Sequence, residues 1–404
     1  MLGICNYDKI ILWEVVYIII KNADLIMPDG ILEGTDVEIT DGLITNIAKG
    51  LWSDNAIDAR DCYVSPGFVD IHTHGGYGCD FMDDNNESFR RVLDFHRDHG
   101  TTSVVASTAT ASEKSIVAVF DRVRRFMKNP GNTARVLGCH VEGPYISFKN
   151  KGAQNPDYLR IPADDDYGFI TDNADVVKNV TISPELDGAP DMTAALIGAG
   201  IRVSGGHDDA TAKDIYPVIE AGMTGCTHWY CAMSTAKVLG TRRSAGLMEI
   251  GLADDRLCLE LLADNHHLVP ELVKIAYVAK GAGKLCLVSD SLRCAGMEAD
   301  GRVYTLGAQG DDGSKFVVDD GVARMADGTR LAGSIQPVSQ MVRNLVFDCG
   351  IPLCDAVRMA SLTPAEFIGV SDKIGSLKIG KRADLCILDR KLNVQKTIIG
   401  GKSA

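Results

Sequence analysis

Hydrophobic and polar positions follow one pattern at the two ends of the chain and another in its middle. Near the N-terminal end, short β-branched runs alternate with Asp-Gly pairs at 29–30 and 41–42, which favour hairpin turns. The C-terminal end has the same character around the apolar run 385–388. Because both ends consist of short strands, they predict one small β-sandwich domain built from residues 1–63 and 374–404.

The middle of the chain alternates apolar runs typical of buried strands with amphipathic runs typical of helices. The predicted strands cover residues 67–70, 102–107, 135–141, 180–183, 201–204, 224–227, 257–262 and 285–289. The predicted helices include residues 88–99, 113–128, 192–199, 211–221 and 268–280. Eight strands separated by helices are the count of a (β/α)8 TIM barrel, which we expect over residues 64–373. No G-x-G-x-x-G motif follows a strand, so a dinucleotide-binding fold has no support.

Composition narrows the set of partners. The chain has 404 residues, of which 46% are hydrophobic, enough for a large core. Its net charge is −13, from 41 Lys and Arg against 54 Asp and Glu. This charge repels phosphodiester backbones and anionic lipids, so neither nucleic acid nor a membrane surface is an expected partner. An anionic small substrate would need a local concentration of arginine or lysine.

Cysteine usage and the N-terminal sequence indicate a cytoplasmic location. The twelve cysteines are dispersed and form no C-x-x-C pair, which disfavours a disulfide framework and a zinc ribbon. An apolar run at residues 10–20 is interrupted by Glu14 and closed by Lys21, so it is too short to span a bilayer. It has no basic region or cleavage site of a signal peptide, and it predicts a strand or an irregular extension.

Histidines and carboxylates directly follow several predicted strands. Taken alone, each could be a polar loop residue or a helix cap. Together they occur after five different strands, at the end of the barrel where barrel enzymes place their active sites. The first two lie two residues apart on an extended segment and so share a face. Imidazole and carboxylate donors without thiolate fit a catalytic site for Zn²⁺ or Fe²⁺. The set is His72, His74, Glu142, His207, His228 and Asp290.

These residues lie within longer motifs that indicate a family. The motifs are Pro66-Gly67-Phe68-Val69-Asp70-Ile71-His72-Thr73-His74, Val141-Glu142-Gly143-Pro144, Lys151-Gly152-Ala153-Gln154-Asn155-Pro156, Gly206-His207, Thr227-His228, Ala232-Met233, Ala263-Asp264, Leu287-Val288-Ser289-Asp290, Gly333-Ser334 and Ala383-Asp384-Leu385. With them the chain resembles the amidohydrolase superfamily, and within it the N-acetylglucosamine-6-phosphate deacetylase family. The resemblance covers nearly the whole chain.

The resemblance implies a metal-dependent hydrolase with one or two divalent ions, Zn or Fe, in each subunit. Glu142 would replace the carboxylated lysine that bridges two metals in other amidohydrolases, and His207 and His228 would complete one site with it. The retained His72 and His74 make a second ion plausible, shared with Glu142 and with Asp290. Asp290 would act as general base on the attacking water and then as general acid to the departing amine.

The resemblance also assigns substrate contacts. His267 matches the family's substrate-binding histidine, and Gln154 stands where many relatives have a histidine that polarises the acyl carbonyl. Cys231 replaces the asparagine that helps to hold the sugar phosphate in relatives, although the backbone of Cys231 and Ala232 could still contribute. Arg242 and Arg243 lie where the family places a phosphate-binding arginine that reaches in from a neighbouring subunit, which implies a homodimer.

The expected reaction is hydrolysis of N-acetyl-D-glucosamine 6-phosphate to glucosamine 6-phosphate and acetate. A related substrate such as N-acetylgalactosamine 6-phosphate, or another amide substrate, remains an alternative because Cys231 departs from the family pattern. A dihydroorotase-like activity is disfavoured, since Gly76 occupies the arginine position of the H-x-H-x-R motif. A catalytically inactive barrel with a binding or assembly role is also disfavoured, because every ligand position is filled.

Overall fold

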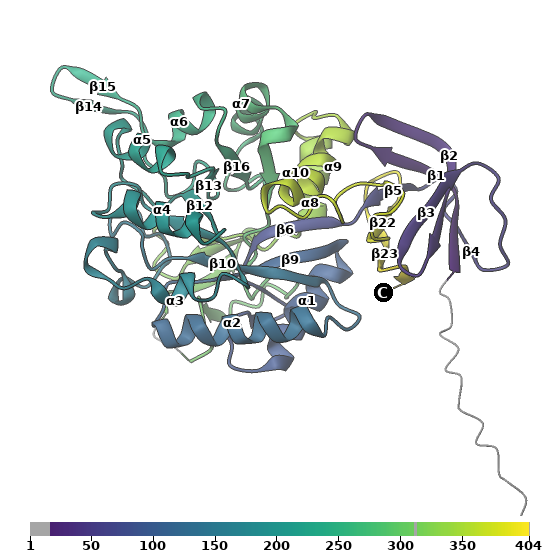
Figure 1. Cartoon of the computed structure of the whole chain (residues 1–404), viewed down its shortest axis with the longest axis horizontal. Helices are drawn as coiled ribbons and strands as arrows, with labels where there is room; N and C mark the ends of the chain where they lie inside the picture. Colours follow the sequence, from purple (N-terminus) through teal and green to yellow (C-terminus); the bar gives the residue numbers. More distant parts are fainter. Residues whose placement is uncertain (1–16, 311–312, 404) are drawn as a thin grey trace, which may run out of the picture.

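The computed structural model describes residues 17–310 and 313–403, which form a barrel and a separate sheet built from both chain ends (Figure 1). The sheet runs β24-β23-β22-β5-β1-β2-β3, with β4 paired to β1. Its strands are β1 (Tyr17–Met27), β2 (Gly30–Thr40), β3 (Leu43–Ala48), β4 (Ala56–Asp58), β5 (Tyr63–Pro66), β22 (Leu385–Leu388), β23 (Val394–Ile399) and β24 (Lys402–Ser403). β5 pairs antiparallel with β22, so the predicted terminal sheet is confirmed.

The two Asp-Gly pairs lie at hairpin turns, as predicted. Asp41 and Gly42 connect β2 to β3 with φ values of 51° and 79°, the left-handed pair that a two-residue hairpin needs. A Cβ on Gly42 would come within 2.9 Å of the Gly400 carbonyl oxygen, so glycine also allows the two ends of the chain to approach. Of the predicted N-terminal segment 10–20, residues 10–16 lie outside the described residues and the rest begins β1.

Eight parallel strands form the barrel, in the order β17-β16-β13-β12-β11-β10-β9-β6. Their bounds are β6 (Phe68–Thr73), β9 (Thr101–Thr108), β10 (Arg135–Glu142), β11 (Val177–Ile182), β12 (Arg202–Gly205), β13 (Gly225–Cys226), β16 (Cys258–Leu261) and β17 (Leu285–Leu287). Beyond the last strand, the Asp290 amide donates to the His72 carbonyl oxygen at 2.9 Å, which joins the two ends of the sheet. Each predicted strand is found in its place, and the predicted barrel fold is confirmed.

Helices surround the barrel (Figure 1). They are α1 (Asn86–Asp98), α2 (Glu113–Lys128), α3 (Gly168–Thr171), α4 (Ala189–Gly198), α5 (Ala212–Glu220), α6 (Leu247–Ala253), α7 (Pro270–Lys280), α8 (Val338–Phe347), α9 (Leu353–Ala360) and α10 (Leu362–Phe367). The first two begin where side chains accept hydrogen bonds from free backbone amides, Asn85 from Ser88 and Ser112 from Ser115. No helix in the described ranges is long and apolar enough to cross a membrane.

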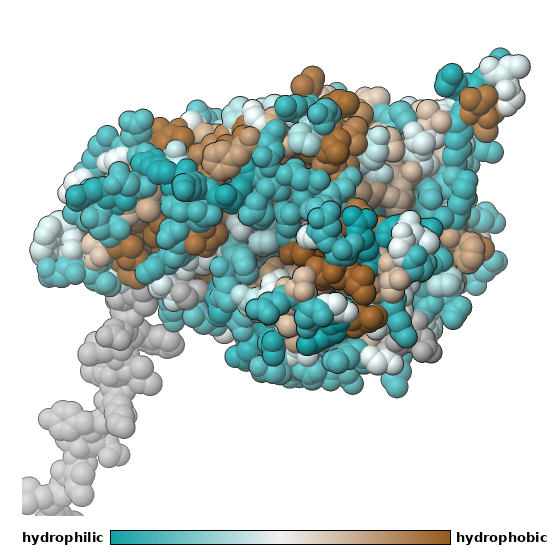
Figure 2. All heavy atoms as spheres, turned by 180° about the vertical axis from the view of Figure 1, so that it is seen from behind, coloured by the Kyte–Doolittle hydropathy of each residue, from teal (hydrophilic) through white to brown (hydrophobic). Residues whose placement is uncertain are grey.

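Two excursions from the barrel were not predicted from the sequence. β14 (Lys237–Leu239) and β15 (Arg242–Ser244) form a hairpin that projects from the barrel (Figures 1 and 2). Val238 and Leu239 on it are 63% and 50% exposed. Between β17 and α8, an antiparallel sheet is inserted, made of β18 (Val303–Thr305), β19 (Lys315–Asp319), β20 (Val322–Met325) and β21 (Leu331–Gly333). This inserted sheet contributes to the site described next.

Candidate active site

The six predicted ligand residues lie together at the carboxyl end of the barrel, and all are buried. His72 lies in β6 with His74 just after it, and Glu142 is the last residue of β10. The other three directly follow β12, β13 and β17. Parallel strands end at one edge, so residues far apart in sequence meet there. Two groups have ligand atoms within 4.8 Å of one another: His72, His74 and Glu142, and Glu142, His207 and His228.

Glu142 is the central residue of this cluster. Its Oε1 lies 3.0 Å from Nε2 of His228 and 3.2 Å from Nε2 of His207. On the other side, Nε2 of His74 lies 3.3 Å from Oε2, and Nε2 of His72 lies 3.4 Å from Oε1. One carboxylate therefore lies between two pairs of imidazoles, each pair presenting its Nε2 atoms.

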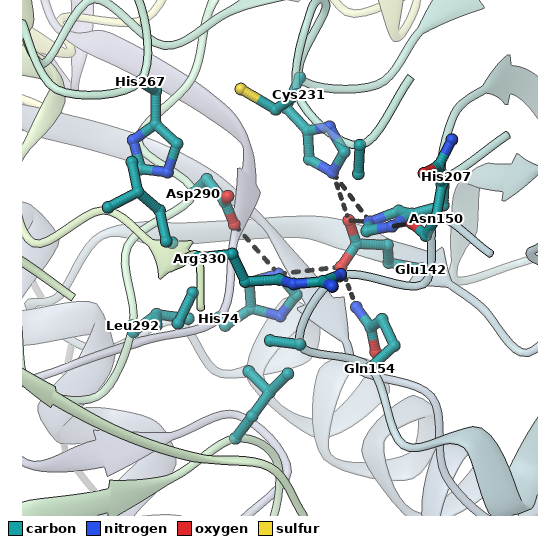
Figure 3. A pocket seen from close by; sticks show the side chains of 18 of the residues that line it. His74, Glu142, Asn150, Gln154, His207, Cys231, His267, Asp290, Leu292 and Arg330 are labelled. Carbon is teal, nitrogen blue, oxygen red and sulfur yellow. Dashed lines mark hydrogen bonds and ion pairs between the residues drawn. The ribbon is translucent and has the colours of Figure 1, made fainter. Parts of the chain in front are cut away.

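Asp290 lies beside only one of the two pairs. Its Oδ1 is 3.3 Å from Nε2 of His74 and 3.6 Å from Nε2 of His72. Its side chain is 12% exposed, against 3% for Glu142, so Asp290 is the more accessible carboxylate of the two from the cavity (Figure 3). A carboxylate that is both close to a metal-binding cluster and accessible can exchange protons with a bound substrate.

The protonation chemistry of the cluster favours a bound cation. Burial opposes ionisation of Glu142, but the neighbouring imidazoles of His72, His207 and His228 hold the pKa of its carboxyl well below the usual value. Burial also opposes the charged form of His74, yet hydrogen bonds to Asp290 and Glu142 raise its pKa to about 9. Without a metal, the His74 imidazole thus carries a proton that offsets the neighbouring carboxylates. A divalent cation can take over that balance, because metal binding releases such protons.

The ring nitrogens themselves also fit a metal. The Nε2 atoms of His207 and His228 lie 3.0 Å apart, and those of His72 and His74 lie 3.3 Å apart. Two protonated imidazoles facing each other at this distance would repel, whereas two neutral ones can coordinate one shared ion. Nitrogen and carboxylate donors of this kind suit Zn²⁺ or Fe²⁺.

Glu260 on β16 orients the cluster and was missed in the sequence. Its Oε2 lies 2.8 Å from Nδ1 of His72 and accepts from the His228 backbone amide at 3.0 Å. The Asn150 carbonyl oxygen, 2.9 Å from Nδ1 of His207, does the same for that ring. Contacts to Nδ1 of this kind direct Nε2 toward the position that a metal ion would occupy. The available signal was a single glutamate within the apolar run of β16.

The loops that carry these side chains are locally strained. His207, His228 and Asp290 have φ values of 49°, 28° and 43°, in the left-handed region that side chains disfavour. Each follows the end of a strand, where the backbone turns sharply to aim the side chain into the barrel mouth. Strain of this kind persists at functional sites, where surrounding contacts impose it.

A cavity of about 570 Å³ opens over the cluster (Figure 3). Its lining includes the predicted substrate residues Gln154, Cys231, Ala232 and His267. Gln154 is fixed in place, since its Nε2 donates to Glu142 Oε2 at 2.6 Å and its Oε1 accepts from the Thr110 amide at 2.7 Å. This contact links the glutamine directly to the central carboxylate.

His267 and Cys231 also line the cavity, on the side opposite Gln154 in the view of Figure 3. Nδ1 of His267 lies 2.7 Å from Oδ2 of Asp264, which leaves Nε2 free to face a ligand. Burial, together with the charges of Asp290 and Asp264, raises the pKa of the Cys231 thiol to about 12. The thiol therefore stays neutral at physiological pH and presents only a weak hydrogen-bond donor.

Arg242 and Arg243 lie outside the cavity of their own chain. Both are exposed residues of β15 on the projecting hairpin. Sequence reasoning also missed several residues that do line the cavity, because they come from loops or from the inserted sheet and follow no recognisable pattern: Lys149, Asn150, Tyr230, Leu292, Leu306 and residues 329–332.

Comparison with known proteins places this geometry in context. Residues 63–404 match the sequence profile of the amidohydrolase family. The chain is 34% identical to an N-acetylgalactosamine-6-phosphate deacetylase of Escherichia coli O157:H7, over 96% of this chain and 99% of that protein. It is 32% identical to an N-acetylglucosamine-6-phosphate deacetylase of Bacillus subtilis (strain 168), over 96% and 97%. A mutant N-acetyl-D-glucosamine-6-phosphate deacetylase from Mycobacterium smegmatis, in complex with N-acetyl-D-glucosamine-6-phosphate, matches with a TM-score of 0.85 at 30% identity, covering 96% of this chain and 99% of that one.

Proposed function

Because this chain belongs to the amidohydrolase family, and within it to the N-acetylglucosamine-6-phosphate deacetylases, we propose that it hydrolyses the acetamide of N-acetyl-D-glucosamine 6-phosphate. The products are glucosamine 6-phosphate and acetate. One structural observation carries the proposal: four imidazoles and two carboxylates converge at the base of one cavity, with Glu142 between them. This donor set suits metal-assisted hydrolysis of a bond as unreactive as an amide.

The metal would be Zn²⁺ or Fe²⁺, with one or two ions in each subunit. Glu142, His207 and His228 would hold one ion. His72 and His74 would hold a second ion, together with Glu142 as a shared ligand. Asp290 would be a further ligand of this second ion and would also transfer the protons. A divalent cation held by these residues would polarise the amide carbonyl and lower the pKa of water.

Asp290 performs the proton transfers in the proposed mechanism. Burial opposes its ionisation, but the imidazoles of His72 and His74 lower the pKa of its carboxyl, so it begins as a carboxylate. It takes a proton from the water that attacks the acetyl carbon. It then gives that proton to the sugar nitrogen as the carbon–nitrogen bond breaks, because an unprotonated amine is a poor leaving group.

The cavity wall would orient the sugar. Gln154 donates to Glu142 and so keeps the central carboxylate in place beneath the acetyl group. His267, steadied by Asp264, offers Nε2 to a sugar or phosphate oxygen. The backbone of Cys231 and Ala232 would complete this part of the binding site, with the thiol contributing little.

N-acetylgalactosamine 6-phosphate is a second candidate substrate. The observation in its favour is the 34% identity to a deacetylase of that sugar phosphate. The two sugars differ only in the orientation of one ring hydroxyl, so the same catalytic groups would serve either. Cavity-wall residues such as Cys231 would then decide between them.

Acetate release from a panel of sugars tests the function. The panel contains N-acetylglucosamine and N-acetylgalactosamine, each with and without a 6-phosphate. We expect the highest kcat/KM for N-acetylglucosamine 6-phosphate and loss of activity after chelation, restored by Zn²⁺ or Fe²⁺. If the metal-loaded protein releases acetate from none of the four, the proposed function is wrong.

Replacing both Arg242 and Arg243 with glutamine is expected to raise KM for the phosphorylated sugar about 10-fold, and to leave the unphosphorylated analogue unchanged. We propose that the chain forms a homodimer in which one of these arginines reaches the neighbouring site. The projecting hairpin, with Val238 and Leu239 exposed, supports such an arrangement. Steady-state kinetics on both sugars, with the oligomeric state measured by light scattering, provide the test. An equal rise in KM for both sugars would show that neither arginine binds the phosphate.

Cysteine chemistry supports a cytoplasmic location for the enzyme. The eleven cysteines among the described residues are all free thiols, as expected in a reducing compartment. Cys258 and Cys286, whose Sγ atoms lie only 3.4 Å apart, are both buried without a disulfide bond.

A further inference from the structure

The proposed substrate carries a phosphate, whereas the protein carries a net charge of −13. Some cation must therefore compensate the phosphate locally. Arg242 and Arg243 lie outside the cavity of their own chain. Among the described residues, the lysine and arginine side chains that line the cavity are Lys149 and Arg330.

Of these two cations, Arg330 is the one available to a ligand. Nζ of Lys149 already contacts a carboxylate, with Oδ2 of Asp209 at 2.7 Å, and this carboxylate also pairs with Lys237. Arg330 is an exposed residue at the cavity, and its side chain makes no ion pair and no hydrogen bond within the part of the chain that the structure describes. The nearby Asp327 accepts from the amide and hydroxyl of Thr329 at 3.0 and 2.7 Å, and these bonds, with a smaller effect of the Arg330 charge, lower the pKa of its carboxyl.

Backbone contacts fix the position of Arg330 relative to the catalytic residues. Its carbonyl oxygen accepts from the Met325 amide at 2.9 Å, which closes the turn between β20 and β21. Just beyond β21, the Ser334 amide donates to the Asp290 carbonyl oxygen at 3.0 Å. The inserted sheet is thus tied to the loop that carries Asp290. In Figure 3 the Arg330 side chain extends across the cavity in the view that also shows His74 and Glu142.

We propose that Arg330 binds the phosphate of the substrate from within the same subunit and so contributes to the preference for a phosphorylated sugar, in addition to the arginine proposed to reach in from a neighbouring subunit. This inference rests on the proposed function. A guanidinium offers two parallel donors that match two phosphate oxygens, whereas an ammonium offers a point charge. The inserted sheet would in this way add a cation that does not depend on a neighbouring subunit.

The kinetic test compares Arg330→Gln, Arg330→Lys and the control Arg324→Gln. Arg324 lies on β20 of the same inserted sheet but pairs with Asp319 at 3.4 Å and does not line the cavity. For the 6-phosphate substrate we expect kcat/KM to fall about 10- to 100-fold in R330Q, mainly through KM, and less in R330K. The unphosphorylated sugar and the R324Q variant should change less than about twofold. Equal losses on both sugars in R330Q would overturn the proposal.

A binding measurement separates this inference from the proposed function. Calorimetry with glucosamine 6-phosphate and with glucosamine on the metal-loaded protein requires no turnover. The unaltered protein should bind glucosamine 6-phosphate more tightly than glucosamine. R330Q should bind glucosamine 6-phosphate about 10-fold more weakly than the unaltered protein does. If R330Q retains it, Arg330 has no role in phosphate binding, even when the unaltered protein releases acetate. If the unaltered protein releases no acetate, the proposed function is wrong, whatever the binding measurement shows for R330Q.

Discussion

Replacing Glu142 with glutamine is expected to lower metal affinity by about 100-fold or more and to abolish acetate release. The carboxylate lies within 3.4 Å of Nε2 atoms from four histidines, so it belongs to both candidate metal groups. Glutamine keeps the shape but removes the negative charge that offsets a divalent cation. It would also place an amide N–H against at least one imidazole nitrogen. Metal content per chain after dialysis, measured by mass spectrometry, tests this directly.

Glu249→Gln is the matched control for this change. Glu249 accepts hydrogen bonds at the start of α6 from Thr235 and from the Gly246 amide, and it does not line the cavity. That variant should keep its metal and its activity even if it loses some stability. Thermal unfolding of both variants shows whether either still folds. A folded Glu142→Gln protein with full metal content would contradict the central role of this carboxylate.

Replacing Asp290 with asparagine is expected to lower kcat by about 10³- to 10⁴-fold while KM changes by less than about threefold. Asparagine cannot accept the proton of water or return it to the amine, so both proton transfers are lost. The group formed by Glu142, His207 and His228 remains intact, so at least one metal should be retained. The expected result is therefore a protein that binds its substrate and its metal but does not turn over.

Pre-steady-state and steady-state kinetics together test this assignment, with substrate affinity measured separately by calorimetry. Asp191→Asn, at an exposed position near the start of α4, makes the same chemical change away from the cavity and should be silent. If Asp290→Asn loses affinity for the substrate but keeps kcat, then Asp290 acts in binding and another group moves the proton.

The barrel and the six candidate ligands were predictable because both depend on local patterns. Apolar runs of strand length alternated with helical runs, and each ligand residue stood at the end of a strand or just beyond it. Parallel strands bring their carboxyl ends to one edge whatever the loops do. The order of the strands therefore placed His72, Glu142 and Asp290 near one another before any distance was known.

Orienting contacts could not be predicted in the same way. Glu260 lies 188 residues from His72, and the sequence shows only a glutamate within an apolar strand. Gln154 could be assigned to the site from the motif that contains it, but not to Glu142 as its partner. Such contacts depend on side-chain directions across the barrel, which no periodic pattern records.

The sequence by itself determined the fold class, the type of metal donors and the identity of Asp290 as the candidate base, since these follow from periodicity and from motifs at strand ends. Only the tertiary structure decided which cations reach the cavity. It places Arg242 and Arg243 on a projecting hairpin, and it places Arg330 at the cavity through an inserted sheet. The physical reason is that loop excursions are positioned by long-range hydrogen bonds and packing, such as the contact from Ser334 to Asp290, rather than by local hydrophobic pattern.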